Sequence, residues 1–131
     1  MHDAEIISLG ISDDKKNITI LTEFQGVKEF ILLKGVVAFR VEDFSIQNVI
    51  ERILIIPNEV CDDEFLNYWI NWATSLSDAG SWLSPEVKED WKMKIKAGDR
   101  NMVVFIPSAG AQIAAVSVGV EVGVKPAGIN N

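Results

Sequence analysis

The stretch that decides the fold reads QIAAVSVGVEVGV and runs from Gln112 to Val124. Its even positions from 116 to 124 are all valine, and its odd positions from 117 to 123 are Ser, Gly, Glu and Gly. Because side chains of a strand alternate between its two faces, this pattern predicts one long strand with a valine face. The face expected to be buried comprises Val116, Val118, Val120 and Val122, and Ser117 and Glu121 are expected on the opposite side.

The length and composition indicate a single domain over residues 1–131, with a frayed tail at 125–131. The chain has 131 residues, 48% of them hydrophobic, and one cysteine, Cys61, which cannot form an internal disulfide. Its beginning, MHDAEIISLG, lacks the basic and apolar regions of a signal peptide, and no apolar run reaches the length of a membrane span. We therefore expect a soluble protein of the reducing cytoplasm.

The long strand predicted over 112–124 must pair with other strands, and the first half of the chain contains candidate strands. Segments 4–11 and 18–24 are predicted strands separated by a polar turn. Gln25-Gly26 predicts a hairpin into 27–33, and Gly35 suggests a bulge within one bent strand over 27–42. Segment 45–56 fits neither period cleanly. Its β-branched residues favour a strand, with a helical first half as the alternative.

A helix is predicted over residues 62–77. Asp62 suits its N-cap and acids follow in the first turn. Apolar residues then recur at helical spacing, at Phe65, Trp69, Trp72, Ala73 and Leu76.

Segment 84–97 supports two interpretations. Ser84-Pro85 is a good helix start, but Trp91, Met93 and Ile95 alternate with lysines as on an edge strand. The first interpretation is a helical turn at 84–89 and a hairpin of strand 90–96 with 101–106. The second is a helix over 84–97 capped by Gly98.

These elements predict an α+β fold. Because the strands come in hairpins, the sheet should be mostly antiparallel, with about seven or eight strands curled into a partly open barrel or sandwich, and one main helix.

Charge is concentrated in the middle of the chain. The formal net charge is −7, and residues 42–90 alone carry −9. Such a surface repels phosphate backbones, so nucleic acid is not expected as a partner. With no apolar run long enough to span a membrane, no membrane partner is expected either.

The sequence contains no recognisable catalytic or metal-binding pattern. The single histidine, His2, lies at the chain terminus, and Cys61 is surrounded by acids that oppose a reactive thiolate. The spacing of His, Cys and acidic residues matches no metal site, and no glycine-rich phosphate loop occurs. We expect no enzyme activity and no cofactor.

The acidic segment holds more aromatic residues than one docking helix requires. Exposed aromatics rimmed by acids would form a surface for a basic protein partner. The candidate partner-binding residues are Tyr68, Trp82, Glu86, Glu89 and Asp90. This compositional profile is similar to that of bacterial immunity proteins, which neutralise basic toxins, and of many adaptor domains. The sequence therefore predicts a non-catalytic protein-binding module, able to form homo-oligomers. The alternative is a barrel-like carrier of a small apolar ligand.

Overall fold

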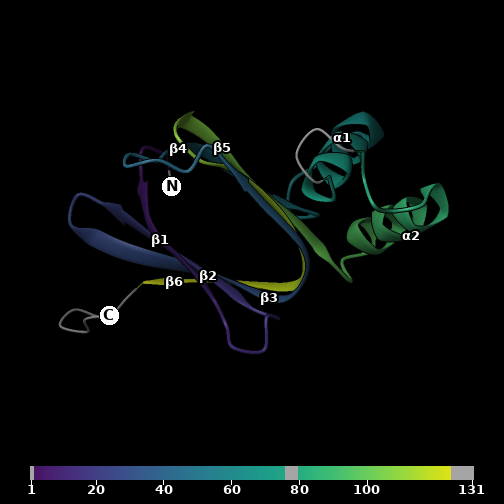
Figure 1. Ribbon diagram of the computed structural model, residues 1–131, viewed down its shortest axis with the longest axis horizontal. Helices are drawn as coiled ribbons and strands as arrows, with labels where there is room; N and C mark the ends of the chain where they lie inside the picture. The colour runs from purple at the N-terminus through teal and green to yellow at the C-terminus, as the bar shows by residue number, and fades with distance from the viewer. Residues whose placement is uncertain (1, 76–79, 125–131) are drawn as a thin grey trace.

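The computed structural model describes residues 2–75 and 80–124 and has an α+β fold (Figure 1). The strands are β1 (Glu5–Ile11), β2 (Ile18–Phe24), β3 (Val27–Glu42), β4 (Val49–Ile56), β5 (Asn101–Ala109) and β6 (Gln112–Val124). The helices are α1 (Asp63–Ala73) and α2 (Pro85–Lys96). All strand pairs are antiparallel, and the sheet closes into a ring in the order β1-β2-β3-β6-β5-β4.

The ring is not a regular barrel, because its closing pair is short. β1 and β4 share a single aligned pair, Glu5 and Val49, whereas β3 and β6 run together along most of their length. The prediction of an antiparallel, curled sheet is confirmed. The predicted seven or eight strands and one main helix are wrong, since the described residues form six strands and two helices.

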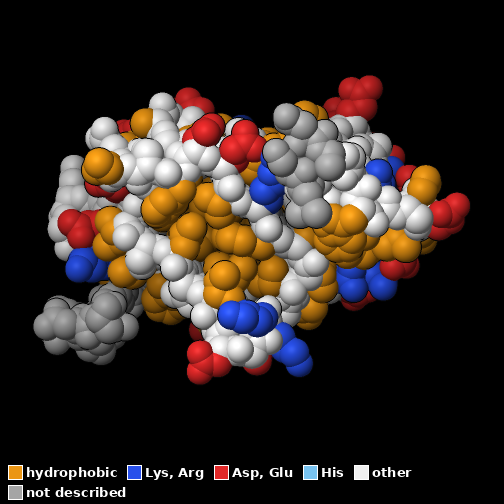
Figure 2. All heavy atoms as spheres, in the orientation of Figure 1, with side chains coloured by type: hydrophobic (Ala, Val, Ile, Leu, Met, Phe, Trp, Pro, Cys, Tyr) orange, Lys and Arg blue, Asp and Glu red, His pale blue; other side chains and the backbone are white. Residues whose placement is uncertain are grey.

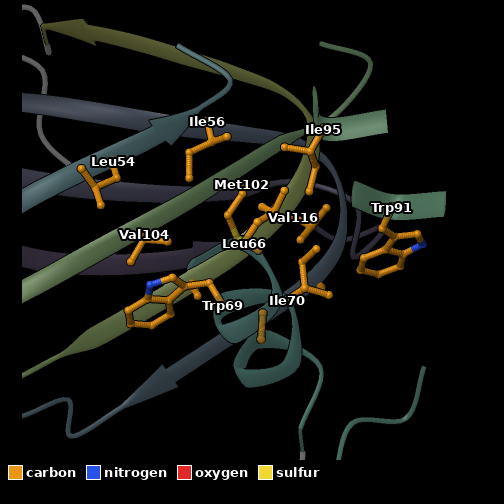
Figure 3. Close-up of a cluster of buried hydrophobic side chains, with 13 residues drawn as sticks. Leu54, Ile56, Leu66, Trp69, Ile70, Trp91, Ile95, Met102, Val104 and Val116 are labelled. Carbon is orange, nitrogen blue, oxygen red and sulfur yellow. The ribbon is translucent and has the colours of Figure 1, made fainter. Parts of the chain in front are cut away.

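Two hydrophobic cores lie on opposite faces of the sheet. The inner core fills the ring, and its buried members include Ile20, Leu33, Val103, Phe105, Ile113 and Ala115. The helix core lies between the outer face and the helices, and its buried members include Leu66, Trp69, Trp91, Ile95, Met102, Val104 and Val116 (Figure 3). Alternate residues of β5 and of the first half of β6 therefore enter different cores, which buries these strands on both faces.

The predicted valine face of β6 is only partly buried. Val116 is buried in the helix core, but Val118 and Val122 are exposed, and Ser117, expected on the open side, is fully buried. The pairing with β3 shifts register between Val36 and Ala38, as expected for a bulge near Gly35. The inner core consequently takes odd residues of β6 at Ile113 and Ala115 but an even one at Val120.

Three predicted strand features are confirmed. β3 is one bent strand of 16 residues. The turn between β2 and β3 has two residues in the left-handed region, Gln25 and Gly26, as a tight hairpin requires. Segment 49–56 is a strand, with Leu54 and Ile56 in the helix core and Ile53 and Ile55 packed against the inner core.

Helix α1 begins as predicted and ends earlier. The Asp62 side chain caps it by accepting a hydrogen bond from Phe65 N at 2.8 Å. The helix ends at Ala73 with Thr74 as its C-cap, and the predicted extension at 76–77 lies outside the described residues, as does the predicted tail at 125–131.

The strand predicted over 90–96 is wrong, and the competing helix is correct. Ser84 caps α2 and Pro85 stands at its first position. Trp91 and Ile95 are buried one turn apart, while Met93 between them is 69% exposed. A strand would have placed all three on one face. β5 accordingly pairs with β4 and β6 instead of forming a hairpin with 90–96.

Candidate functional sites

The surface of the two helices carries the predicted partner-binding residues. Tyr68 lies on α1 and is 59% exposed, and its ring meets the edge of Trp69 with centroids 5.0 Å apart. Trp82 precedes α2 and is 54% exposed, with its ring 6.0 Å from Trp91 in an edge-to-face contact. Both supporting tryptophans are buried in the helix core. Each exposed ring is therefore held against a fixed neighbour, which restricts its rotamers.

Tyr68 and Trp82 belong to two separate aromatic sets. On α1, Trp69 contacts Phe65, Tyr68 and Trp72. Beside α2, Trp82 contacts Trp91. Within the described residues no ring contact joins the sets. The surface of the two helices therefore presents two separate exposed aromatic side chains, Tyr68 on α1 and Trp82 before α2.

The three predicted acids of α2 are all exposed, but two are paired on their own helix. Glu89 lies 3.0 Å from Lys92, and Asp90 lies 2.8 Å from Lys94. For Glu86, no ion pair is found in the part of the chain that the structure describes. Since α2 carries three acids and four lysines, its charge is nearly balanced. The acidic character expected of this surface is correspondingly reduced.

A buried lysine ties the two helices together. The ammonium of Lys92 is 3.5 Å from Asp63 at the start of α1, and Lys96 also pairs with Asp63. The hydrogen bond from Lys96 and the charge of Lys92 lower the pKa of Asp63. The hydrogen bond to Glu89 raises the pKa of Lys92, against the effect of its burial. The sequence reasoning missed this network, because it placed the lysines on a strand.

Two arginines that the sequence reasoning did not single out stack on tryptophans. The guanidinium of Arg40 lies 4.3 Å from the ring centroid of Trp72 and donates a hydrogen bond to its backbone oxygen at 3.0 Å. Arg100 lies 5.2 Å from the ring centroid of Trp91. Such contacts fix both partners, so they add rigidity to the layer that presents Tyr68 and Trp82.

A second candidate site is a pocket of about 640 Å³ at the mouth of the ring, which we call the ring-mouth slot. Its apolar lining comes from β3, β4 and β6, through Ile31, Ile53, Ile55 and Val122. Its polar lining comprises His2, Glu29, Glu51 and Arg52. In Figure 2, apolar side chains gather in the middle of the face drawn, over the ring of strands, with charged side chains at the margin.

A smaller pocket of about 310 Å³ lies beside the start of α1. Arg52 lines this pocket as well as the slot, and Cys61 lies in it. Burial, with the nearby Asp62, raises the pKa of the Cys61 thiol. The thiol is therefore a poor nucleophile at neutral pH.

Among the residues that the structure describes, the remaining polar groups form no recognisable reactive centre. His2 pairs with the neighbouring Asp3 at 3.0 Å on an exposed surface. Across residues 2–75 and 80–124, no three His, Cys, Asp or Glu side chains gather as metal ligands would. Neither described helix has the length and apolar content to cross a membrane.

Comparisons with known proteins gave no match for this chain. Protein-family models, curated proteins and solved structures were each searched, and none matched.

Proposed function

We propose that the protein is a non-catalytic binding module that holds another protein on the outer surface of its helix layer. The observation that carries this proposal is the state of Trp82, which is more than half exposed although its ring rests against the buried Trp91. Tyr68 is presented in the same way on α1. Aromatic side chains that are exposed yet fixed lose little entropy on binding, and they dominate the energy of many interfaces.

The charge of the chain favours a basic partner. The acidic segment 42–90 carries a formal net charge of −9. Opposite charge mainly raises the association rate, and buried aromatics mainly slow dissociation. Because Lys92 and Lys94 neutralise Glu89 and Asp90, Glu86 is the member of the predicted set best able to steer a partner.

The experiment compares Trp82→Ala and Tyr68→Ala with the wild type in copurification from the native cell, followed by kinetics with the partner recovered. We expect each variant to dissociate at least about tenfold faster, as truncation of an aromatic hot-spot residue does. Glu86→Gln should slow association at low salt only.

The matched control is Ile46→Ser, which removes a fully exposed apolar side chain from the loop between β3 and β4. Thermal unfolding of each variant separates lost binding from lost folding. A partner that binds Trp82→Ala, Tyr68→Ala and Glu86→Gln with the same kinetics as the wild type would refute the proposal.

A second candidate function is the binding of a small apolar molecule in the ring-mouth slot. The slot's volume of about 640 Å³ supports it, since small-molecule sites usually measure about 300–1,000 Å³. Two carboxylates and one guanidinium at its rim leave no strong excess of positive charge. An uncharged ligand is therefore favoured over a fatty acid.

The uncharged fluorescent probe N-phenylnaphthylamine tests this candidate. Ile53→Trp should fill the slot and abolish a fluorescence increase that Ile46→Trp leaves unchanged. A wild-type protein that gives no increase, or equal increases in both variants, would exclude the slot as a ligand site.

A further inference from the structure

The second half of β6 has an open edge. On one side, β3 pairs with β6 from Gln112 to Val124. On the other side, β5 pairs with β6 only from Ile113 to Ser117. Beyond Ser117 the Asn101 side chain donates a hydrogen bond to Val118 O at 3.4 Å. Among the described residues, no strand pairs with this edge over 119–124.

This half of β6 also exposes apolar side chains. Val118, Val122 and Val124 are 58%, 52% and 63% exposed. Alternate residues of an edge strand direct both their N–H and C=O groups outward. An edge that combines free backbone groups with exposed valines is a template for another strand.

The sequence of this edge is a palindrome. Residues 118–124 read VGVEVGV and are symmetric about Glu121. An antiparallel pair of two such strands, related by a twofold axis at Glu121, brings each valine opposite a valine and each glycine opposite a glycine. Self-complementarity of this kind is what a twofold contact between identical chains requires.

We propose that two copies of the chain associate through residues 118–124 of β6, in antiparallel register about Glu121. The sheet β1-β2-β3-β6 of one copy then continues into the same sheet of the second copy. The pairs across the interface are Val118 with Val124, Gly119 with Gly123, Val120 with Val122, and Glu121 with its own counterpart.

The central pair places like charges opposite each other, and each carboxylate already has a partner. Glu121 lies 2.6 Å from Lys34 of β3. Val120 packs against the inner core, so Glu121 points to the outer face, where the two ion pairs form a row across the axis. The remaining repulsion weakens the pairing and keeps the dimer reversible.

Disulfide trapping tests the register. Glu121→Cys is made in a Cys61→Ser background, and the control is Gly119→Cys in that background. Opposed side chains of a sheet have Cβ atoms about 4.5–5.5 Å apart, close to disulfide range. Two residues at position 119 would be offset by four residues, or about 13 Å. The control should fold, because a Cβ at Gly119 meets its nearest neighbour, Lys34 Cβ, at 3.8 Å.

Under mild oxidation we expect a covalent dimer from Glu121→Cys and none from Gly119→Cys. Equal cross-linking of both variants, or of neither, would overturn the proposed register.

Sedimentation over a range of concentrations tests the association itself. The wild type should dimerise, and Glu121→Gln should dimerise roughly two- to fivefold more tightly, because the opposed charges are removed. Val122→Asp should be monomeric. Its control is Val27→Asp, an exposed valine on the β2–β3 hairpin, which should dimerise like the wild type.

A wild type that stays monomeric at every concentration overturns the proposal. If Glu121→Gln alone dimerises, Glu121 serves to keep the edge unpaired, and the proposal fails as well. If Val122→Asp does not fold, the comparison of Glu121→Gln with the wild type decides.

Discussion

Gly110 shows how strongly a single position can be constrained in this fold. It adopts a φ of +77° in the turn from β5 to β6, and a Cβ there would lie 2.5 Å from the Asn48 side-chain oxygen. That oxygen accepts hydrogen bonds from Ser45 N at 2.9 Å and from Ala111 N at 3.1 Å. Asn48 is itself buried and joins the β3–β4 loop to the β5–β6 turn. Only glycine leaves room for this contact.

We predict that Gly110→Ala lowers the free energy of unfolding by about 2–5 kcal/mol, through left-handed strain and overlap with Asn48. Gly26→Ala is the matched control. Gly26 has a φ of +80°, but no heavy atom lies within 4 Å of its would-be Cβ. The control should lose only about 1–2 kcal/mol. Urea unfolding measures both, and equal losses would show that the packing around Asn48 is not the constraint.

At the scale of elements, α2 shows where the sequence pattern was ambiguous. Trp91, Met93 and Ile95 alternate with lysines, and the same residues also satisfy helical spacing if Met93 is exposed. Ser84 and Pro85 favoured the helix. Local apolar alternation cannot decide such a case, because the deciding contacts come from α1 and from Met102 of β5 in the helix core.

A pair of substitutions separates the two interpretations in solution. Met93→Ser should change the free energy of unfolding by less than about 0.5 kcal/mol, as expected of an exposed helical residue. Ile95→Ala should cost about 2–5 kcal/mol through a cavity in the helix core. Chemical unfolding monitored by circular dichroism measures both. A loss of similar size at both positions would indicate that they share a buried strand face.

The bridge between α1 and α2 predicts a pH dependence. The pKa of Asp63 is lowered in the folded protein, chiefly by its hydrogen bond from Lys96. The unfolded protein therefore binds a proton at higher pH than the folded one, and the bridge stabilises the fold above the unfolded pKa of about 3.9. Asp63→Asn should thus lower the melting temperature at neutral pH. The difference in melting temperature from the wild type should vanish as the pH falls through the lowered pKa of the folded protein. A difference that persists in acid would mean that Asp63 acts through packing.

For the whole molecule, the sequence predicted the sheet better than the surfaces that the sheet and helices create. Six predicted strand segments are strands, because their β-branched runs and turns are local signals. The ring-mouth slot joins Ile31, Ile53 and Val122, and no local pattern relates these distant positions. Two of the predicted acids of α2, Glu89 and Asp90, form ion pairs with Lys92 and Lys94. The sequence could not predict these pairs, because they form only if the segment is helical.

The seam that closes the ring is the weakest part of its wall. β1 and β4 are joined by backbone hydrogen bonds of 2.8 Å from Asp3 N to Ile50 O, from Ile6 N to Asn48 O and from Ile50 N to Ala4 O. Few bonds must break together to open this seam, whereas opening β3 from β6 breaks a long ladder.

We therefore predict that the amides of Ile6 and Ile50 exchange with solvent through local opening, faster than amides in the middle of β3, although both side chains are buried. Native-state hydrogen exchange measured by NMR tests this, and equal protection of seam and ladder would contradict it. The same measurement separates the two candidate functions. A ligand in the ring-mouth slot contacts β3, β4 and β6 beside the seam, so it should slow exchange at Ile50. A partner held at Tyr68 and Trp82 should leave the seam unchanged and protect amides of α1 and α2.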